Sequence, residues 1–366
     1  MEQHVIIEQS ALVTALGTHQ DTSKRLLKGD SAFKTAPCFG IPVAHAPFED
    51  VCFRNLTECF TFLRPQLDLS RVPDDKNLLF IYAAAKGDIR ALEPGADKAD
   101  DQSPLLPVQA TQVAEILGIH PACTMIISNA CASGAVACAT ARLFLKAGRF
   151  STAVIAGFDV ISHFVTSGFH SLGALSSSGA RPFDADRDGL TLGDGAACAV
   201  LHCRPAIDGD IIIAGAAQSN DANHRTGPSR TGEGLYRAAA AALENGNIPP
   251  KLVSSVKCHG TATVYNDAME AKAVNRLFAG NPPPCFSVKG SIGHTSGAGS
   301  LIEVLLAGEF LRRNTIPPTA NFHRPDREAP LPVSDSAQTI STPSILCLSA
   351  GFGGLNAAIL LREWHA

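Results

Sequence analysis

A strand, a helix and a second strand follow one another within roughly 35 residues in the middle of the chain. Residues 124–128 (TMIIS) form a short apolar run, typical of a strand buried on both faces of a sheet. Residues 131–150 carry Ala, Val, Leu and Phe at helical spacing and end in Lys146-Ala-Gly148, a helix stop signal. Residues 151–160 (STAVIAGFDV) form a second apolar strand. This order predicts a βαβ unit, and hence a parallel sheet with helices packed against it.

The second half of the chain repeats this pattern. Strands and helices alternate from residue 210 onward, and residues 345–363 are typical of a hairpin around a Gly-rich turn. A similar hairpin is expected at residues 189–203. We therefore predict two α/β halves, residues 1–205 and 206–366, related by duplication, although no residue-level repeat is convincing.

Composition narrows the class of protein. The chain has 366 residues, 45% of them hydrophobic, and a formal net charge of -4. A sizeable core is therefore available, and the basic stripe of a nucleic-acid-binding protein is missing. No apolar run reaches the roughly 18 to 20 residues that span a bilayer, and Met1-Glu-Gln-His does not resemble a signal peptide. A cytosolic protein is expected.

The cysteines do not indicate a disulfide scaffold, because a chain of this length can build a hydrophobic core without disulfides. No CxxC pair occurs. Ten of the eleven cysteines are interpreted as inert packing residues: Cys38, Cys52, Cys59, Cys123, Cys138, Cys198, Cys203, Cys258, Cys285 and Cys347.

Cys131, in SNACASGAV, lies where the strand gives way to the helix. Free backbone N–H groups and the helix dipole at such a junction favour a thiolate and lower the pKa of a cysteine. The same N–H groups can bind an oxyanion, so the position suits acyl transfer. Small residues beside a buried cysteine are also common in tightly packed helices, and this motif by itself leaves both interpretations open.

Two later stretches each place a histidine beside glycine after strand-like residues, where α/β proteins build their sites. The first, CHGTATVYNDAMEAKA, carries His259, Thr261, Thr263, Asp267 and Glu270. The second, SVKGSIGHTSGAGSLIE, carries Lys289, His294 and Glu303.

With these stretches the chain resembles the β-ketoacyl-acyl-carrier-protein synthases, the elongating condensing enzymes of thiolase fold. The matching motifs occur in order: NACASG, RPFDADRDGLTLGDGA, GPSRTGEG, HGTATVYNDAMEAKA, VKGSIGHTSGAG, IPPTANFHRPD and GFGGLNAAILL. The resemblance implies a thiolase-like α/β fold whose duplicated halves form five αβαβα layers. It also implies an acyltransferase that condenses malonyl carrier with an enzyme-bound acyl group, losing carbon dioxide, in fatty-acid or polyketide synthesis.

The resemblance assigns roles to individual residues. Cys131 becomes the nucleophile, and His259 and His294 become the pair that binds the malonyl thioester carbonyl. Neutral imidazoles supply donors for the enolate without holding the carboxylate back. Lys289 is expected to form an internal ion pair with Glu270. The backbone N–H groups of Cys131 and Phe352 become the oxyanion hole.

Further residues follow from the same resemblance. Phe352 becomes an acyl gate whose flanking glycines, including the substrate-binding Gly353, let the backbone move. Thr261 and Thr263 bind the pantetheine arm, and Asp267 supports the site. Simpler interpretations remain: Asp267 and Glu270 as a solvated helix face, and Phe352 as core. Glu303 needs a partner, for which a hydrogen bond is the simplest expectation.

No metal or organic cofactor is required, because phosphopantetheine arrives on the substrate. The expected partners are an acyl carrier protein and a second ketosynthase-like subunit, identical or a chain-length factor. Relatives dock the carrier through a basic residue where this chain has Gly173. Other basic residues could take over this role or be ordinary surface charges: Arg64, Arg71, Lys76, Lys146 and Arg149.

Three related classes of protein each differ from this chain in one feature. A thiolase, which condenses without decarboxylation, carries a second cysteine where this chain has Phe352. An initiating synthase replaces one histidine by asparagine, and a chain-length factor lacks the nucleophile. The region 77–121 looks shorter than usual, which favours a specialised polyketide or aryl-polyene-type pathway. The remaining histidines are interpreted as structural: His45, His120, His163, His170, His202, His224, His323 and His365.

Overall fold

The computed structural model describes residues 2–48, 55–72, 75–93, 103–341 and 344–365. Cys52 lies outside these ranges, and the side chains of Arg71 and Lys76 are outside those described. Every element given below belongs to this described part of the chain.

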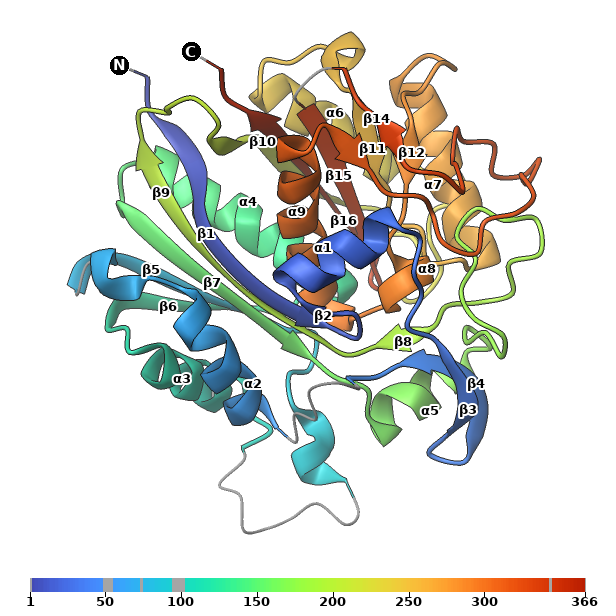
Figure 1. Cartoon of the computed structure of the whole chain (residues 1–366), viewed down its shortest axis with the longest axis horizontal. Helices are drawn as coiled ribbons and strands as arrows, with labels where there is room; N and C mark the ends of the chain where they lie inside the picture. The colour runs from blue at the N-terminus through green and yellow to red at the C-terminus, as the bar shows by residue number, and fades with distance from the viewer. Residues whose placement is uncertain (1, 49–54, 73–74, 94–102, 342–343, 366) are drawn as a thin grey trace.

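Regular structure alternates between strands and helices along both halves (Figure 1). The main strands of the first half are β1 (His4–Thr14), β5 (Asp75–Ala83), β6 (Pro121–Ile127), β7 (Thr152–Asp159) and β9 (Gly195–Arg204). Its helices are α1 (His19–Leu27), α2 (Leu56–Leu63), α3 (Leu106–Leu117), α4 (Ser133–Lys146) and α5 (His163–Ser171). Its short strands are β2 (Gly17–Thr18), β3 (Lys34–Cys38), β4 (Ile41–Ala46) and β8 (Leu192–Gly193).

The second half has the same kinds of element. Its main strands are β10 (Ile211–Asn220), β11 (Ser255–Lys257), β12 (Cys285–Phe286), β15 (Ser344–Gly351) and β16 (Leu355–Glu363). Its helices are α6 (Glu233–Asn245), α7 (Val264–Leu277), α8 (Lys289–Ile292) and α9 (Ser296–Arg312). The short strands β13 (Thr315–Ile316) and β14 (Gln338–Thr339) pair with each other.

Both halves order their main strands in the same way, which reveals the duplication that residue identities hide. The path through the sheet is β6-β5-β7-β9-β1 in the first half and β12-β11-β15-β16-β10 in the second. Taken in chain order, both paths read 3-2-4-5-1, and corresponding pairs agree in being parallel or antiparallel. The two half-sheets join where Ile6 of β1 faces Ile212 of β10. Duplicated α/β halves are thus confirmed, while the division at residues 205 and 206 stays a prediction.

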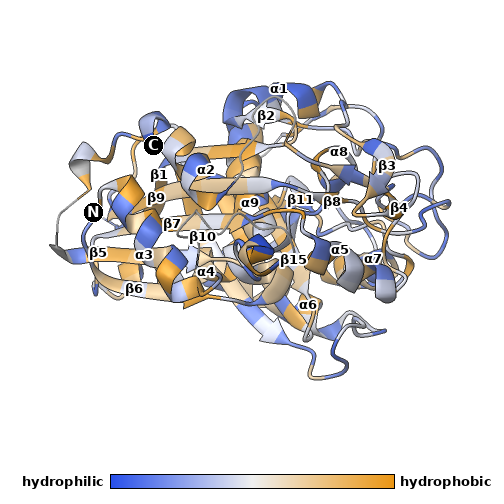
Figure 2. Ribbon diagram, turned by 90° about the horizontal axis from the view of Figure 1, so that it is seen from below, coloured by the Kyte–Doolittle hydropathy of each residue, from blue (hydrophilic) through white to orange (hydrophobic). Residues whose placement is uncertain are grey.

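Helices and half-sheets alternate in five layers, as the thiolase-like interpretation implies. Helices α2 and α3 cover the outer face of the first half-sheet, α4 and α9 lie between the half-sheets, and α6 and α7 cover the second half-sheet. Strand residues alternate between the layers: in β5, Leu78 and Phe80 join the outer cluster, and Leu79 and Ile81 join the central one. Figure 2 shows hydrophobic residues along the strands and α9, and hydrophilic ones on α1 and the periphery.

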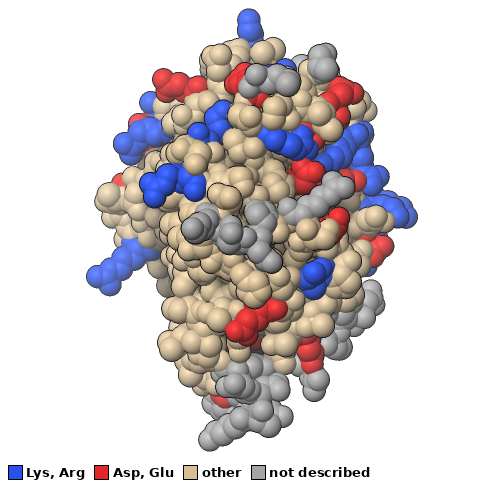
Figure 3. All heavy atoms as spheres, turned by 90° about the vertical axis from the view of Figure 1, so that its left-hand side faces the viewer, with Lys and Arg blue, Asp and Glu red and all other residues tan. Residues whose placement is uncertain are grey.

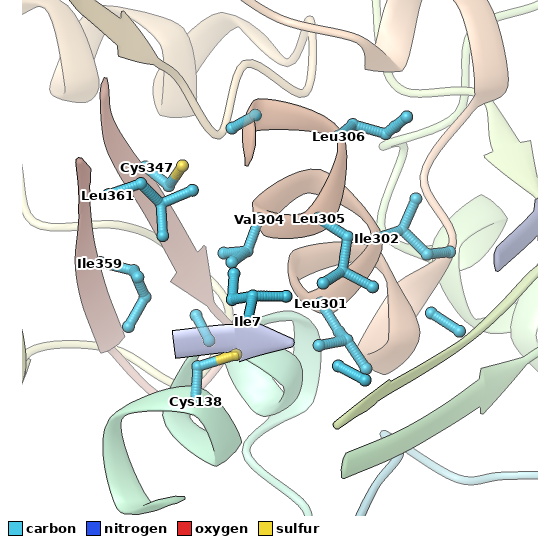
Figure 4. Packing of buried hydrophobic residues seen from close by; sticks show 14 of the residues in the cluster. Ile7, Cys138, Leu301, Ile302, Val304, Leu305, Leu306, Cys347, Ile359 and Leu361 are labelled. Carbon is cyan, nitrogen blue, oxygen red and sulfur yellow. The ribbon is translucent and has the colours of Figure 1, made fainter. Parts of the chain in front are cut away.

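The central layer holds the largest cluster of buried apolar side chains, in which α9 is buried on nearly all sides (Figure 4). Leu301 of α9 lies beside Gly134 of α4, where a Cβ on the glycine would come 2.3 Å from the Leu301 backbone nitrogen. Gly134 therefore lets the two helices cross closely. Close helix packing is thus one reason for the small residues after Cys131.

Two expectations about strands were wrong. Residues 189–203 do not form a hairpin, because β8 pairs in parallel with β4, whereas β9 pairs with β1 and β7. The run TMIIS is not buried on both faces: its first four residues belong to β6, the last strand on its side of the described sheet, where Thr124 is exposed and residues 125–127 are half-buried. A local pattern identifies a strand but not which strands lie beside it.

The surface agrees with the charge balance of the sequence. Figure 3 shows basic and acidic side chains interspersed on the face it presents. Among the described residues, we find no helix long and apolar enough to cross a bilayer.

Replacing Gly134 with alanine tests the central crossing. We expect the variant to lower the free energy of unfolding by about 1 to 3 kcal/mol, because α4 and α9 must move apart. Gly168→Ala is the matched control, since nothing lies within 4 Å of a Cβ at this position in α5. It should be neutral or stabilise by a few tenths of a kcal/mol. Urea unfolding of both variants is the measurement, and equal values would contradict the close crossing.

Candidate active site

Cys131 lies at a sharp turn between β6 and α4. Ala130 has a φ of 49°, in the left-handed region that non-glycine residues rarely adopt. The Ser133 hydroxyl holds the turn by donating to the Ala130 carbonyl at 2.6 Å and accepting from the Asn129 N–H at 2.8 Å. The turn places Cys131 two residues before Ser133, the first residue of α4, so that it lies at the strand-to-helix junction that the sequence predicted.

The protonation state of Cys131 differs from the sequence-based expectation. Burial raises the pKa of its thiol to about 11, and the positive charge of Lys289 acts in the opposite direction without overcoming it. Cys131 is 8% exposed. The lowered pKa expected from the helix terminus is therefore wrong, because burial dominates and the side chain is a neutral thiol.

His259 is fixed by a carboxylate on the neighbouring helix. Glu270 of α7 accepts the backbone N–H groups of His259 and Gly260, the latter at 2.8 Å. Asp267, one turn earlier, accepts from the N–H groups of Ala262 at 3.2 Å and Phe183 at 2.8 Å. Both carboxylates are fully buried, so the interpretation as a solvated helix face is wrong. They hold the HGTAT loop in place rather than touching the cavity.

Burial also sets the charge of these two carboxylates. It raises the pKa of Glu270 to about 7 and that of Asp267 to about 6, while the amides that they accept act in the opposite direction.

His294 reaches the site from a separate segment between α8 and α9. Its backbone N–H donates to the Thr191 carbonyl at 2.6 Å, and its carbonyl accepts from the Gly193 N–H at 3.1 Å. The His259 and His294 rings are 5.5 Å apart between centroids and lie edge to face at 85°. The structure therefore brings together the two histidines that the sequence singled out.

Lys289 pairs with Glu303, not with Glu270 as expected. Its Nζ donates to Oε1 of Glu303, to the His259 carbonyl at 2.8 Å, and lies 3.4 Å from Nδ1 of His259. Glu270 is already occupied by backbone amides. The hydrogen-bond partner expected for Glu303 is therefore a charged residue, Lys289. Glu303 also has a second charged partner, because Lys257 of β11 donates to its Oε2.

Both imidazoles are neutral. Burial is the main cause that holds the pKa of His259 and of His294 well below the ordinary 6.5, and the positive charge of Lys289 lowers both further. Because Lys289 donates toward Nδ1 of His259, the ring proton of His259 sits on Nε2.

Cys131, His259 and His294 line one cavity of about 390 Å³. Thr261, Thr263 and Phe352 also line it, and the hydroxyls of the two threonines are 3.0 Å apart. Gly353 is not in the lining: its N–H donates to the Arg225 carbonyl at 2.7 Å within the turn. The structure thus gathers six of the predicted residues around one space, while Gly353 and Lys289 are outside its lining.

The turn between β15 and β16 packs directly on the Cys131 turn. A Cβ at Gly351 would lie 3.3 Å from the backbone nitrogens of both Cys131 and Ala132. Phe352 follows at once, so its backbone runs beside that of Cys131. Its ring packs against Phe169 of α5, with centroids 5.5 Å apart and the ring planes tilted by 41°.

Sequence reasoning missed several residues of the site. Phe169 and His224 line the cavity, and His224 had been interpreted as structural. Lys257 was passed over, although a lone lysine between Val256 and Cys258 in an apolar strand was a usable signal. Gly173 also lines the cavity, whereas the carrier-docking candidates Arg64, Lys146 and Arg149 do not.

No group of three or more His, Cys, Asp or Glu side chains in the described ranges has the arrangement of a metal site.

Removing the shared carboxylate should destabilise the protein strongly. We expect Glu303→Gln to lower the free energy of unfolding by about 3 to 5 kcal/mol, because two buried lysines lose their counter-ion. Glu309→Gln, on the same helix but paired with Arg313 near the surface, is the control and should cost less than about 1 kcal/mol. Urea unfolding at neutral pH measures both, and similar costs would refute the buried cluster.

The difference in unfolding free energy between the wild type and Glu303→Gln should depend on pH. The two lysines outweigh the effect of burial and hold the pKa of Glu303 below its ordinary 4.5. The carboxylate therefore contributes stability above pH 4.5 that is lost as the pH falls through the lower, folded-state pKa. The difference between wild type and Glu303→Gln should shrink on acidification.

Comparison with known proteins places this site in a family. Residues 98–205 match the family description "Beta-ketoacyl synthase, N-terminal domain", and residues 211–323 match "Beta-ketoacyl synthase, C-terminal domain". A putative polyketide beta-ketoacyl synthase 1 of Streptomyces cyaneus is 34% identical over 75% of this chain and 67% of its own. The 3-oxoacyl-[acyl-carrier-protein] synthase 2 of Rhizobium meliloti is 33% identical over 65% of this chain and 60% of its own.

Solved structures agree with this placement. A beta-ketoacyl synthase from Burkholderia phymatum, 25% identical, superposes with a TM-score of 0.86 over 99% of this chain and 100% of its own. A type II polyketide ketosynthase in complex with its acyl-carrier protein shares the fold, with a TM-score of 0.87 over the whole of both chains at 22% identity. The chain belongs to the β-ketoacyl synthase family.

Proposed function

We propose that this chain catalyses decarboxylative Claisen condensation, joining a malonyl unit to an acyl group held on Cys131. The observation that carries the proposal is the meeting of one thiol and two neutral imidazoles around one cavity. The chain spans 60 to 67% of the length of the two curated relatives described above. The activity, substrates and partners are therefore argued from the site itself.

The first step transfers an acyl group to Cys131. The sulfur attacks the carbonyl carbon of an acyl thioester, the bond to the carrier sulfur breaks, and the thiol proton of Cys131 ends on the leaving sulfur of the carrier arm. The N–H groups of Cys131 and Phe352 stabilise the tetrahedral oxyanion. The packing of Gly351 on the Cys131 turn supports this pairing of amides.

The second step removes carbon dioxide from a malonyl thioester. The bond between the α-carbon and the carboxylate breaks, carbon dioxide leaves, and the electron pair forms an enolate on the thioester oxygen. The imidazole N–H groups of His259 and His294 stabilise that oxygen. Neutral rings suit this step, because a cation would bind the carboxylate and slow its departure.

The third step forms the carbon–carbon bond. The α-carbon of the enolate attacks the acyl thioester on Cys131, and the oxyanion hole stabilises the resulting oxyanion. Collapse of this intermediate expels the Cys131 sulfur as a thiolate, which takes a proton from solvent, and the β-ketoacyl product stays on the carrier arm.

Substrate binding is proposed for the groups at the cavity wall. The hydroxyls of Thr261 and Thr263 are placed to bind the amides of a pantetheine arm. Phe352 acts as the gate for the acyl chain, and Gly353 and Gly354 serve as its hinge. Their φ values of 87° and 76° belong to a turn that only glycine forms without strain.

An acyl carrier protein and a second ketosynthase-like subunit are the proposed partners. The partly exposed residues of β6, which ends its side of the described sheet, support a subunit contact there. The fold is shared by a ketosynthase in complex with its chain length factor, with a TM-score of 0.82, so the second subunit is either identical or a chain-length factor.

The substrate class and the location complete the proposal. One matched relative is named a polyketide beta-ketoacyl synthase and the other a 3-oxoacyl-[acyl-carrier-protein] synthase, so we retain both polyketide and fatty-acid chains as proposed substrates. We propose a cytosolic location and no resident cofactor, since the pantetheine arm comes with the substrate.

Acylation of Cys131 is the direct test. Intact-protein mass spectrometry after incubation with acyl-carrier thioesters of graded length should show one acyl adduct on the wild type and none on Cys131→Ala. Cys138→Ala, which removes a buried thiol from the same helix, should keep the adduct. Adducts on another residue, or none with any donor, would refute the mechanism.

The histidine pair is tested by separating acylation from condensation. His294→Ala should still accept the acyl group on Cys131, but malonyl decarboxylation and condensation should fall by at least about a hundredfold, as expected for loss of an oxyanion donor. Unchanged condensation would remove His294 from the site.

The gate is tested through its backbone. Gly353→Ala should slow acylation by long acyl groups, because alanine stiffens a turn that must move. Gly40→Ala is the matched control, with a φ of 80° and open space around it in the turn between β3 and β4. Both variants should lose about 1 to 2 kcal/mol of stability, and only the first should slow acylation. Equal acylation rates would argue against the gate.

A further inference from the structure

Lys257 is a buried cation that the proposed mechanism does not use. It is the last residue of β11, two residues before His259, and is 1% exposed. Its Nζ donates to Oε2 of Glu303 and to the Leu348 carbonyl at 2.9 Å. A lysine buried this completely is costly, so its presence requires an explanation beyond packing.

Lys257 shares its counter-ion with Lys289. Glu303 presents Oε1 to Lys289 and Oε2 to Lys257, so that one carboxylate serves two ammonium groups. Lys289 alone would neutralise Glu303. Lys257 therefore adds a surplus positive charge and occupies the oxygen to which Lys289 would otherwise also bind.

We propose that Lys257 is a positioning residue for the histidine pair: by holding Oε2 of Glu303, it commits Oε1 to Lys289 and keeps Lys289 against His259. This inference rests on the function proposed above and adds a residue to its machinery. Lys257 acts through Glu303 and Lys289 and does not line the cavity.

The first consequence concerns the ring proton of His259. Lys289 reaches the carbonyl of His259 at 2.8 Å and Nδ1 at 3.4 Å only while Glu303 anchors it from one side. If Oε2 lost Lys257, the carboxylate could turn both oxygens toward Lys289 and draw it away. The proton of His259 would then no longer be confined to Nε2.

The second consequence concerns charge. Burial is the main cause of the lowered pKa of both imidazoles, and the charges of Lys289 and Lys257 each lower them further. Burial lowers the pKa of Lys257, but the negative charge of Glu303 outweighs burial, so the pKa is raised. Lys257 therefore stays charged. The charged or titratable groups around Lys257 and the histidines are Glu270 on α7, Lys289 on α8, Glu303 on α9, Cys347 on β15, and Lys86 after β5.

The test is the pH dependence of malonyl-carrier decarboxylation in Lys257→Gln. Removing the positive charge raises the pKa of the imidazoles, so they become protonated at higher pH. The acidic limb of the rate profile should therefore move to higher pH, on the order of one pH unit, with a rate roughly tenfold lower below the limb. Lys257→Arg, which keeps the charge, should restore the position of the limb.

A matched control separates positioning from stability. Val256→Ala opens a small cavity at the neighbouring buried position of β11 and leaves Glu303 untouched. It should lower stability without moving the limb. An unmoved limb in Lys257→Gln, or an equal movement in Val256→Ala, overturns the proposal.

Nitrogen-15 NMR of labelled histidine supplies a second readout, which does not depend on the variant folding. In the wild type, His259 should be neutral with its proton on Nε2, and should stay neutral at the ordinary histidine pKa of 6.5. A proton on Nδ1, or an imidazolium at or above pH 6.5, overturns the proposal. If the wild type lacks decarboxylation altogether, the proposed function fails, and the histidine titration of Lys257→Gln compared with that of the wild type still decides the role of Lys257: an unchanged imidazole pKa overturns the proposal.

Discussion

The close crossing of α4 and α9 between the two half-sheets is the contact on which the site depends. It is possible because Gly134 has no side chain where the backbone of Leu301 passes. Both helices begin near the cavity: Cys131 precedes α4, His294 precedes α9, and Glu303 lies within α9. Any change in the spacing of the helices would therefore move the nucleophile relative to the histidines and the buried charges.

Burial then decides the chemistry of these groups. Burial keeps both the Cys131 thiol protonated and the two imidazoles neutral. It also makes unpaired charges costly, which is why Glu303 is held by two lysines and why Glu270 and Asp267 accept backbone amides. In the proposed reaction, negative charge develops on an oxygen of the substrate. The backbone and imidazole N–H groups proposed to stabilise this oxyanion are in position before the reaction begins.

Much of the local structure could be predicted from the residues. The helix α4 and the final hairpin lie where the apolar spacing and the Gly-rich turn placed them, and strands and helices alternate from residue 210 onward as predicted. The pairing of β8 and the edge position of β6 could not be predicted, because both depend on strands that are distant in the sequence. The pairing of Lys289 with Glu303 was missed for a similar reason: the competing partner, Glu270, is occupied by amides that only the folded loop brings to it.

The sequence by itself determined which residues are proposed to carry the chemistry. Cys131, His259 and His294 stand in motifs whose order along the chain identifies the family, and whose residue types suit acyl transfer and enolate stabilisation. The tertiary structure alone decided how these residues are charged and held. The pKa of a thiol or an imidazole depends on burial and on charges from other elements, and the second lysine on Glu303 comes from a strand 46 residues away in sequence. Such contacts exist only after the chain has folded.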